Sequence, residues 1–295
     1  MNWMQKFYED KYKLLLIFPF LILLAAFIQI GLQYSTTGDF VNKGISLKGG
    51  STITFPYSDS YNLIQIEEKM SATFQDEEIT IRTIHSAGKI IAVAIDTNLE
   101  EEQKIANVRD FLETETGLSA TDFNIEVVGS SLGESFFRQT ATALLIGFLL
   151  MGLVVFIYFK TLVPSLAVVL AAFSDIVVTL AIFNLTGEKL STAGVAAFLM
   201  LIGYSVDTDI LLSTRVLKRL ELPIMERIYS SIKTGLTMTI TTTVAVLVAF
   251  LFVHSEVVKQ ISLIIIIGLL VDTIMTWIQN VGILRIYLER KEHKK

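Results

Sequence analysis

Six long apolar segments constrain this chain more than any other feature of its sequence. They cover approximately residues 14–32, 140–159, 163–185, 191–213, 234–253 and 259–284. Each is close to the ~20 residues that an α-helix needs to cross about 30 Å of hydrocarbon. Backbone N–H and C=O groups find no partner in lipid, so spanning segments of this kind must be helical. The sequence therefore predicts an α-helical membrane bundle of six transmembrane helices.

The composition agrees with a membrane protein that also carries a soluble part. Hydrophobic residues make up 52% of the chain and charged residues 18%, and the mean hydropathy is +0.59. There is no cysteine, and the three histidines are far apart, so we expect no metal site and no cofactor. Phosphate-loop and nucleophile-elbow motifs are absent, so no enzymatic activity is predicted. A net charge of −5 gives no support to nucleic-acid binding.

The polar block between the first two apolar segments predicts a soluble domain. Residues 33–138 contain 17 acidic and 8 basic side chains. Apolar residues alternate or recur with helical spacing along this block, which predicts strands at 51–55, 79–84, 90–95 and 123–128 and helices at 61–74 and 99–115. The order β-α-β-β-α-β is that of an α+β ferredoxin-like domain.

The distribution of lysine and arginine predicts the topology. Most basic residues outside the polar block lie on one side of the predicted spans: Lys6, Lys11, Lys13, Lys160, Arg215, Lys218, Arg219, Arg227, Arg285, Arg290, Lys291, Lys294 and Lys295. The opposite short loops carry only Lys189 and Lys259. By the positive-inside rule, both termini are expected in the cytoplasm. The prediction is a cytoplasmic N-terminus and helix 1 in residues 1–32, an extracytoplasmic domain in 33–138, and helices 2–6 with a cytoplasmic C-terminus in 139–295.

Several charged residues lie inside the predicted spans. Asp207 and Asp209 are in the fourth span, Asp175 in the third and Asp272 in the sixth, while Lys233 borders the fifth. A charge near the bilayer centre costs roughly 2.5–3.5 kcal/mol on insertion scales. Four carboxyl groups against one lysine cannot all be compensated, so we expect most of them to be protonated at neutral pH. Side chains that switch between a neutral and a charged form are suited to a proton or ion relay.

Helical geometry separates the two aspartates of the fourth span. Residues two apart differ by about 200° in direction, so Asp207 and Asp209 cannot face the same partner. Asp209 shares a face with Ser205, and Asp207 shares one with Gly203. We expect one aspartate to face Lys233 or its neighbours and the other to face a partner protein or a wet cavity. A purely structural role, in which neutral aspartates bond across helices, remains open at this point.

Two segments resemble motifs of a known family. Residues 43–51, KGISLKGGS, look like the motif just outside the first span of the SecD/SecF family, and residues 202–215, from Ile202 to Arg215, resemble its fourth-span motif. One outward domain followed by five spans matches one half of a transporter of the RND superfamily. The chain is therefore identified as a member of the SecD/SecF family, nearest to its archaeal SecF branch.

This resemblance implies a function and a set of site residues. A SecF-type chain would be an accessory subunit of the Sec protein translocase in the cytoplasmic membrane. It would pair with SecD, act beside the Sec protein-conducting channel on preprotein substrates, contact membrane lipids, and use the transmembrane proton gradient. The implied proton or ion relay comprises Asp207, Asp209, Lys233, Asp175 and Asp272. The implied hinge and motif glycines are Gly44, Gly49, Gly50 and Gly203.

The chain departs from the family pattern at two positions. The aspartate of bacterial SecF aligns with Thr208, whereas Asp207 takes the place of the SecD aspartate. Lys233 stands where bacterial SecF has an arginine, and a lysine can lose its proton when desolvated.

Two alternative functions remain open from the sequence. An RND-type small-molecule or lipid transporter usually has two six-span halves and two large outward domains, whereas this chain has one half and one small domain. A structural membrane scaffold would tolerate neutral replacement of the charged residues in the spans.

Overall fold

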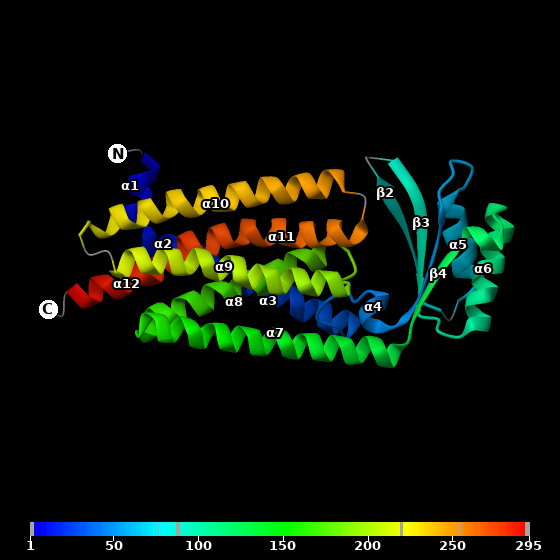
Figure 1. Ribbon diagram of the computed structural model, residues 1–295, viewed down its shortest axis with the longest axis horizontal. Coiled ribbons are helices and arrows are strands. Elements are labelled where there is room, and N and C mark those ends of the chain that lie inside the picture. Colours follow the sequence, from blue (N-terminus) through cyan, green and yellow to red (C-terminus); the bar gives the residue numbers. More distant parts are fainter. Residues whose placement is uncertain (1–2, 76, 87–88, 219–220, 254, 293–295) are drawn as a thin grey trace.

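Six long apolar helices form a bundle, and a small sheet domain lies at one end of it (Figure 1). The computed structural model describes residues 3–75, 77–86, 89–218, 221–253 and 255–292. After the short α1 (Trp3–Asp10), the spans are α2 (Tyr12–Leu15) with α3 (Ile17–Thr37), α7 (Ser130–Phe159), α8 (Leu162–Leu185), α9 (Thr192–Lys218), α10 (Ile224–Phe252), and α11 (Glu256–Ile274) continued by η2 (Met275–Asn280) and α12 (Val281–Glu292). The predicted six-helix bundle is confirmed, although most of its helices extend beyond their apolar segments.

The helices divide into an inner and an outer set. More than half of the most apolar stretch is buried in α8, α9 and α11, whereas only 11% of it is buried in α7 and in α10. The outer helices expose large apolar side chains such as Leu149, Val154 and Leu247. Water does not favour such a surface, but the acyl chains of a bilayer do.

The sheet domain has the predicted ferredoxin-like topology. Its elements are β1 (Gly50–Pro56), α5 (Leu63–Thr73), β2 (Ile79–Ser86), β3 (Lys89–Thr97), α6 (Glu102–Thr116), the short η1 (Ala120–Asp122) and β4 (Asn124–Val128). The strands are antiparallel in the order β2-β3-β1-β4. The helices α5 and α6 cover the sheet face that is turned away from the bundle (Figure 1).

Alternation along the strands explains this core. Ile53 and Phe55 point to the same side of β1 and are almost fully buried, as is Ile95 on β3. They pack with Met70 of α5 and Leu112 of α6 in one apolar cluster. The opposite face of the sheet is more polar, and there Asp96 accepts hydrogen bonds from Thr52 and Arg82.

The chain crosses from the bundle to the sheet through a crowded glycine pair. A short helix that the sequence analysis missed, α4 (Ile45–Lys48), ends at Gly49, whose φ and ψ of 92° and 167° are essentially restricted to glycine. A Cβ atom on Gly49 would lie 2.3 Å from the Cα atom of Ser130, and one on Gly50 would lie 2.2 Å from the carbonyl oxygen of Thr97. The glycines therefore allow a close backbone crossing, and the implied hinge at this point stays a prediction.

Both chain termini lie at the end of the bundle away from the sheet domain (Figure 1). The N-terminal part of the first span is tied to α12 there, because the Tyr12 hydroxyl donates to Glu289 and the Arg285 guanidinium lies 3.8 Å from the Tyr12 ring centroid. The start of the first span and the end of the sixth are thus joined at one end of the bundle.

Candidate functional site

Three carboxyl groups meet in the interior of the bundle, one from each inner helix. Asp175 comes from α8, Asp209 from α9 and Asp272 from α11. Their exposed fractions are 0%, 0% and 1%. Side chains of the surrounding helices therefore form their immediate environment.

Asp209 and Asp272 are joined by one hydroxyl group. The Oγ1 atom of Thr276 lies 3.0 Å from Asp209 Oδ1 and 2.9 Å from Asp272 Oδ1. Asp209 Oδ1 also accepts a hydrogen bond of 2.7 Å from the side-chain amide of Asn280. One oxygen of Asp209 therefore has two potential donors, both from the sixth span.

Asp175 has a hydrogen-bonding partner on α9 that also lies beside Asp272. The hydroxyl of Ser205 donates to Asp175 Oδ2 over 2.5 Å. The adjacent Ser174 accepts a hydrogen bond of 3.2 Å from Gln279 Nε2. Ser205 and Asp209 are on the same buried face of α9, as the sequence analysis predicted.

A π-helical turn presents the polar side chains of the sixth span to the site. η2 interrupts the α-helix directly after α11, and π-helical turns are rare and frequent at functional sites. Thr276, Gln279 and Asn280 all lie in this turn, and each is fully buried. A π-helical turn contains more residues than an α-helical turn, so more of its side chains can point toward α8 and α9.

The site contains more acid than the surrounding groups can compensate. One oxygen of each carboxyl group, namely Asp175 Oδ1, Asp209 Oδ2 and Asp272 Oδ2, has no hydrogen-bond partner among the described residues. Over the described part of the chain, no lysine or arginine forms an ion pair with any of the three. A buried carboxylate without a counter-charge is very costly, so these groups favour holding protons. Such a cluster can bind protons and release them.

Asp207 and Lys233 do not belong to this cluster. Asp207 is exposed on the outer side of α9, and Lys233 is exposed on α10. Buried Asp209 therefore does not face exposed Lys233, and no ion pair joins Asp207 to Lys233 among the described residues. The reason is helical phase: Gly235 faces inward against the Trp277 ring, and Lys233, two residues earlier, points to the opposite side.

Two other motif glycines have different surroundings. The amide of Gly44 donates to the carbonyl oxygen of Leu190 over 2.8 Å, which joins the segment before α4 to the loop between α8 and α9. Gly203 is exposed, and a Cβ atom there would meet nothing within 4 Å. Packing inside this chain therefore explains Gly44 but not Gly203.

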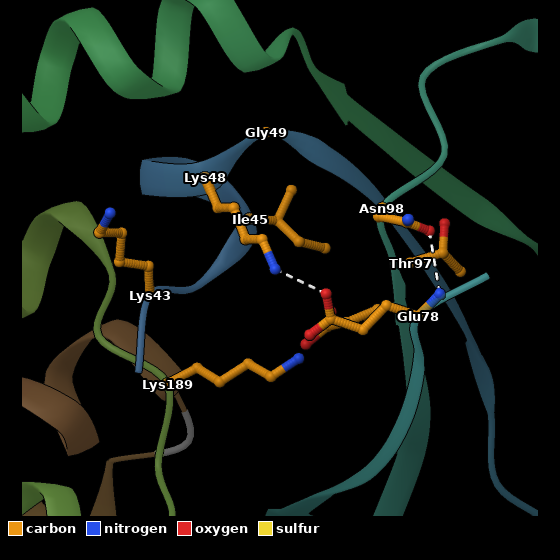
Figure 2. Close-up of a pocket in the computed structure, with 9 residues that line it drawn as sticks. Lys43, Ile45, Lys48, Gly49, Glu78, Thr97, Asn98 and Lys189 are labelled. Carbon is orange, nitrogen blue, oxygen red and sulfur yellow. Dashed lines mark hydrogen bonds and ion pairs between the residues drawn. The ribbon is translucent and has the colours of Figure 1, made fainter. Parts of the chain in front are cut away.

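A second polar group lies where the sheet domain meets the bundle. Figure 2 shows Lys48 and Lys189 approaching Glu78 at the beginning of β2. Lys48 Nζ is 2.6 Å from Glu78 Oε2, and Lys189 Nζ donates to the Thr80 hydroxyl over 3.1 Å. The hydrogen bond from Lys48 lowers the pKa of Glu78, with smaller effects of the Lys48 and Lys189 charges opposed by partial burial. The cavity between these residues is about 20 Å³, enough for about one water and too small for an organic ligand.

The sequence analysis missed the polar residues that complete the carboxyl cluster. Asp272, Thr276, Gln279 and Asn280 recur at intervals of four, three and one residues, which places them on one helical face. This polar stripe in an otherwise apolar span was a usable signal. The π-helical turn that widens the stripe has no comparable signal in the sequence.

Comparisons with known proteins agree on one family. The family model described as "Protein export membrane protein SecD/SecF, C-terminal" matches residues 108–290. A protein-export membrane protein SecF of Pyrococcus furiosus is 38% identical over 96% of this chain and 93% of its own length. The SecF of Methanocaldococcus jannaschii is 32% identical over 96% of this chain and 98% of its own length.

A solved structure has the same fold. The crystal structure of SecDF from Thermus thermophilus, a translocon-associated membrane protein, superposes with a TM-score of 0.75 at 20% identity. The match covers 95% of this chain but only 38% of the SecDF chain, so this chain corresponds to a part of that protein.

Proposed function

Because this chain belongs to the SecD/SecF family of protein-export membrane proteins, we propose that it is the SecF-type accessory subunit of a Sec translocase. It acts in the cytoplasmic membrane without an enzymatic active site of its own. It pairs with a SecD-type chain and assists the export of preproteins through the Sec protein-conducting channel. Support comes from relatives named SecF that match nearly the full length of this chain.

The partner covers the exposed polar side of α9 and α10. Gly203 and Asp207 are exposed one turn apart on α9, and Lys233 is exposed on α10, where they would otherwise contact lipid acyl chains. An exposed carboxylate within hydrocarbon is costly, and a second bundle with complementary polar groups removes that cost. The glycine allows the partner helix to approach closely.

The inner carboxyl cluster takes up and releases the protons that drive export. The observation that carries this proposal is the burial of three aspartates on three adjacent helices, with hydroxyl and amide partners and without a paired base among the described residues. Protonation changes the charge of such a site, so it also changes how tightly the three helices pack. A proton gradient across the membrane can thereby drive a change in the bundle.

The sheet domain is the part that moves in response. It contacts the bundle through α4, the start of α7 and the Lys48–Glu78 ion pair. The sheet itself is held by the Lys48–Glu78 ion pair and by the hydrogen bond from Lys189 to Thr80, so a change in the bundle can alter the position of the domain. The cavity beside the Lys48–Glu78 pair, about 20 Å³, is too small for an organic ligand, which favours mechanical coupling over small-molecule binding at that point.

The test is preprotein translocation into vesicles that contain the complete Sec complex, with and without a proton gradient. Asp209→Asn keeps the size and hydrogen-bonding capacity of the side chain but cannot titrate, so the gradient-stimulated rate should fall to the level without a gradient. Glu134→Gln removes an exposed acid of α7 that lies outside the cluster, and it should leave the stimulation unchanged. Full stimulation in both Asp209→Asn and Asp272→Asn would show that the carboxyl cluster is structural.

A further inference from the structure

A single hydroxyl group lies between two buried carboxyl groups. The Thr276 oxygen is within hydrogen-bond distance of one oxygen of Asp209 and one of Asp272. A hydroxyl group has one hydrogen to donate and two lone pairs that accept. Thr276 can therefore donate to only one of the two aspartates at a time. The other aspartate makes a favourable contact with the threonine oxygen only if it donates its own hydrogen to that oxygen.

This geometry favours a proton on one of the two carboxyl groups. If both were ionised, the carboxylate to which Thr276 does not donate would hold a negative oxygen against a lone pair of Thr276 Oγ1, at 3.0 Å for Asp209 or 2.9 Å for Asp272. With one proton present, a continuous chain forms, from the protonated carboxyl to the threonine oxygen and from the threonine hydroxyl to the ionised carboxyl. We infer that Asp209, Thr276 and Asp272 form a relay that shares one proton, with Thr276 as the group that passes it. The role of this relay in export rests on the proposed function.

The neighbouring groups indicate where the proton resides. Asn280 donates to the same Asp209 oxygen that Thr276 approaches, and two donors stabilise an ionised oxygen. Asp272 also lies beside the Ser205 hydroxyl, but the single hydrogen of that hydroxyl is donated to Asp175, so Asp272 gains no second donor from it. The remaining titratable group packed around the relay is Asp175 on α8, which is held by Ser205. The proton is therefore held by Asp272, and Asp209 is its acceptor.

The transfer step conserves atoms and charge. The O–H bond of Asp272 breaks as its proton moves to Thr276 Oγ1, and the original hydroxyl proton of Thr276 moves to Asp209 Oδ1. Asp272 becomes a carboxylate, Asp209 becomes neutral and Thr276 remains a hydroxyl. Rotation of that hydroxyl about the Cβ–Oγ1 bond resets the relay. No other reactant is needed.

The decisive variant is Thr276→Val, which keeps the shape of the side chain and removes the hydroxyl. In vesicles with the complete Sec complex, its gradient-stimulated rate should fall roughly 100-fold, the lower end of the contribution of a positioned proton-transfer group. Thr276→Ser keeps the hydroxyl and should retain most of the stimulation. The matched control is Thr273→Val, because the Thr273 hydroxyl bonds only to the Leu269 carbonyl of its own helix. Retention of full stimulation by Thr276→Val would overturn the inference, whether or not Asp209→Asn is active.

Infrared difference spectroscopy of the purified complex in lipid tests proton sharing without an export assay. The wild-type protein should show one protonated carboxyl band from this pair, which disappears in Asp272→Asn and shifts in Thr276→Val but not in Thr273→Val. Two protonated bands from Asp209 and Asp272, or none, would contradict the relay even if export remained gradient-dependent. If the single shared band is present but Asp209→Asn exports normally, the proposed use of the gradient fails while the shared proton stands.

Discussion

Asp207 and Asp209 are two residues apart, and that offset places one carboxyl group on the bundle surface and the other in its interior. The sequence predicted this division, because side chains two residues apart on a helix point in nearly opposite directions. It could not predict the partners of Asp209, since Thr276 and Asn280 lie about 70 residues further along the chain and meet it only after the helices pack.

The exposed side chains of Asp207 on α9 and Lys233 on α10 should contribute to association with the SecD-type partner. We predict that Asp207→Leu and Lys233→Met reduce recovery of the SecD-type partner after mild solubilisation, because the polar contacts that hold the partner are lost. Leu149→Ala, an exposed change on α7, is the control and should leave recovery unchanged. Normal recovery with both Asp207→Leu and Lys233→Met would place the partner on another face.

The ion pair at Glu78 should make the junction sensitive to acid. The pKa of Glu78 is lower in the folded protein than its ordinary value, so the pair stabilises the junction at any pH above that ordinary value. The contribution is lost as pH falls through the lowered pKa. Both side chains are at least half exposed, so it amounts to about 0.2–1 kcal/mol.

A pair of fluorophores, one on the sheet domain and one on the bundle, measures this effect. The wild-type distance distribution should broaden as the outer solution is acidified below the ordinary pKa of a glutamate. Glu78→Gln should show the broadened distribution at neutral pH and respond less to acid. A response of Glu78→Gln equal to that of the wild type would exclude this residue as the cause.

At the scale of elements, alternation and helical spacing were sufficient to predict the sheet domain. Ile53, Phe55 and Ile95 face the core in the expected phase, and the two amphipathic helices cover them. Helix ends were less predictable, because α3 and α7 continue through polar residues beyond the apolar stretch. The π-helical turn could not be predicted, since its hydropathy does not differ from that of an α-helix.

The close approach of the Gly49 backbone, after α4, to the Ser130 backbone, at the start of α7, gives a prediction about the packing of α4 on α7. Gly49→Ala should disrupt the contact between α4 and α7, because it combines an unfavourable backbone conformation, about 1–3 kcal/mol, with a Cβ atom 2.3 Å from the Ser130 backbone. Gly117→Ala is the matched control, with positive φ but open space around it, and should cost only about 1–2 kcal/mol. Thermal unfolding of the purified complex measures the loss of stability in each variant. Equal losses in Gly49→Ala and Gly117→Ala would exclude a contribution from the clash between the Gly49 Cβ atom and the Ser130 backbone.

At the scale of the whole molecule, the distribution of basic residues predicts the orientation in the membrane. The sheet domain and the two termini lie at opposite ends of the bundle (Figure 1). The chain has no cysteine, so a single introduced one reports its side unambiguously. We predict that Thr73→Cys, at the exposed end of α5, reacts with an impermeant reagent added outside. Reaction only from the cytoplasmic side would reverse the topology.

The position of the sheet domain in the chain has a consequence for how the protein can be altered. Gly50 at the start of β1 pairs with Val128 at the end of β4, so the chain enters and leaves the domain at adjacent points. Neighbouring strands are only about 5 Å apart. A segment whose two ends are this close can be excised and replaced by a few glycines, or exchanged for the equivalent segment of a relative, without separating α3 from α7. The domain is thus an interchangeable module, and chimaeric chains could show whether preference for particular exported proteins travels with it.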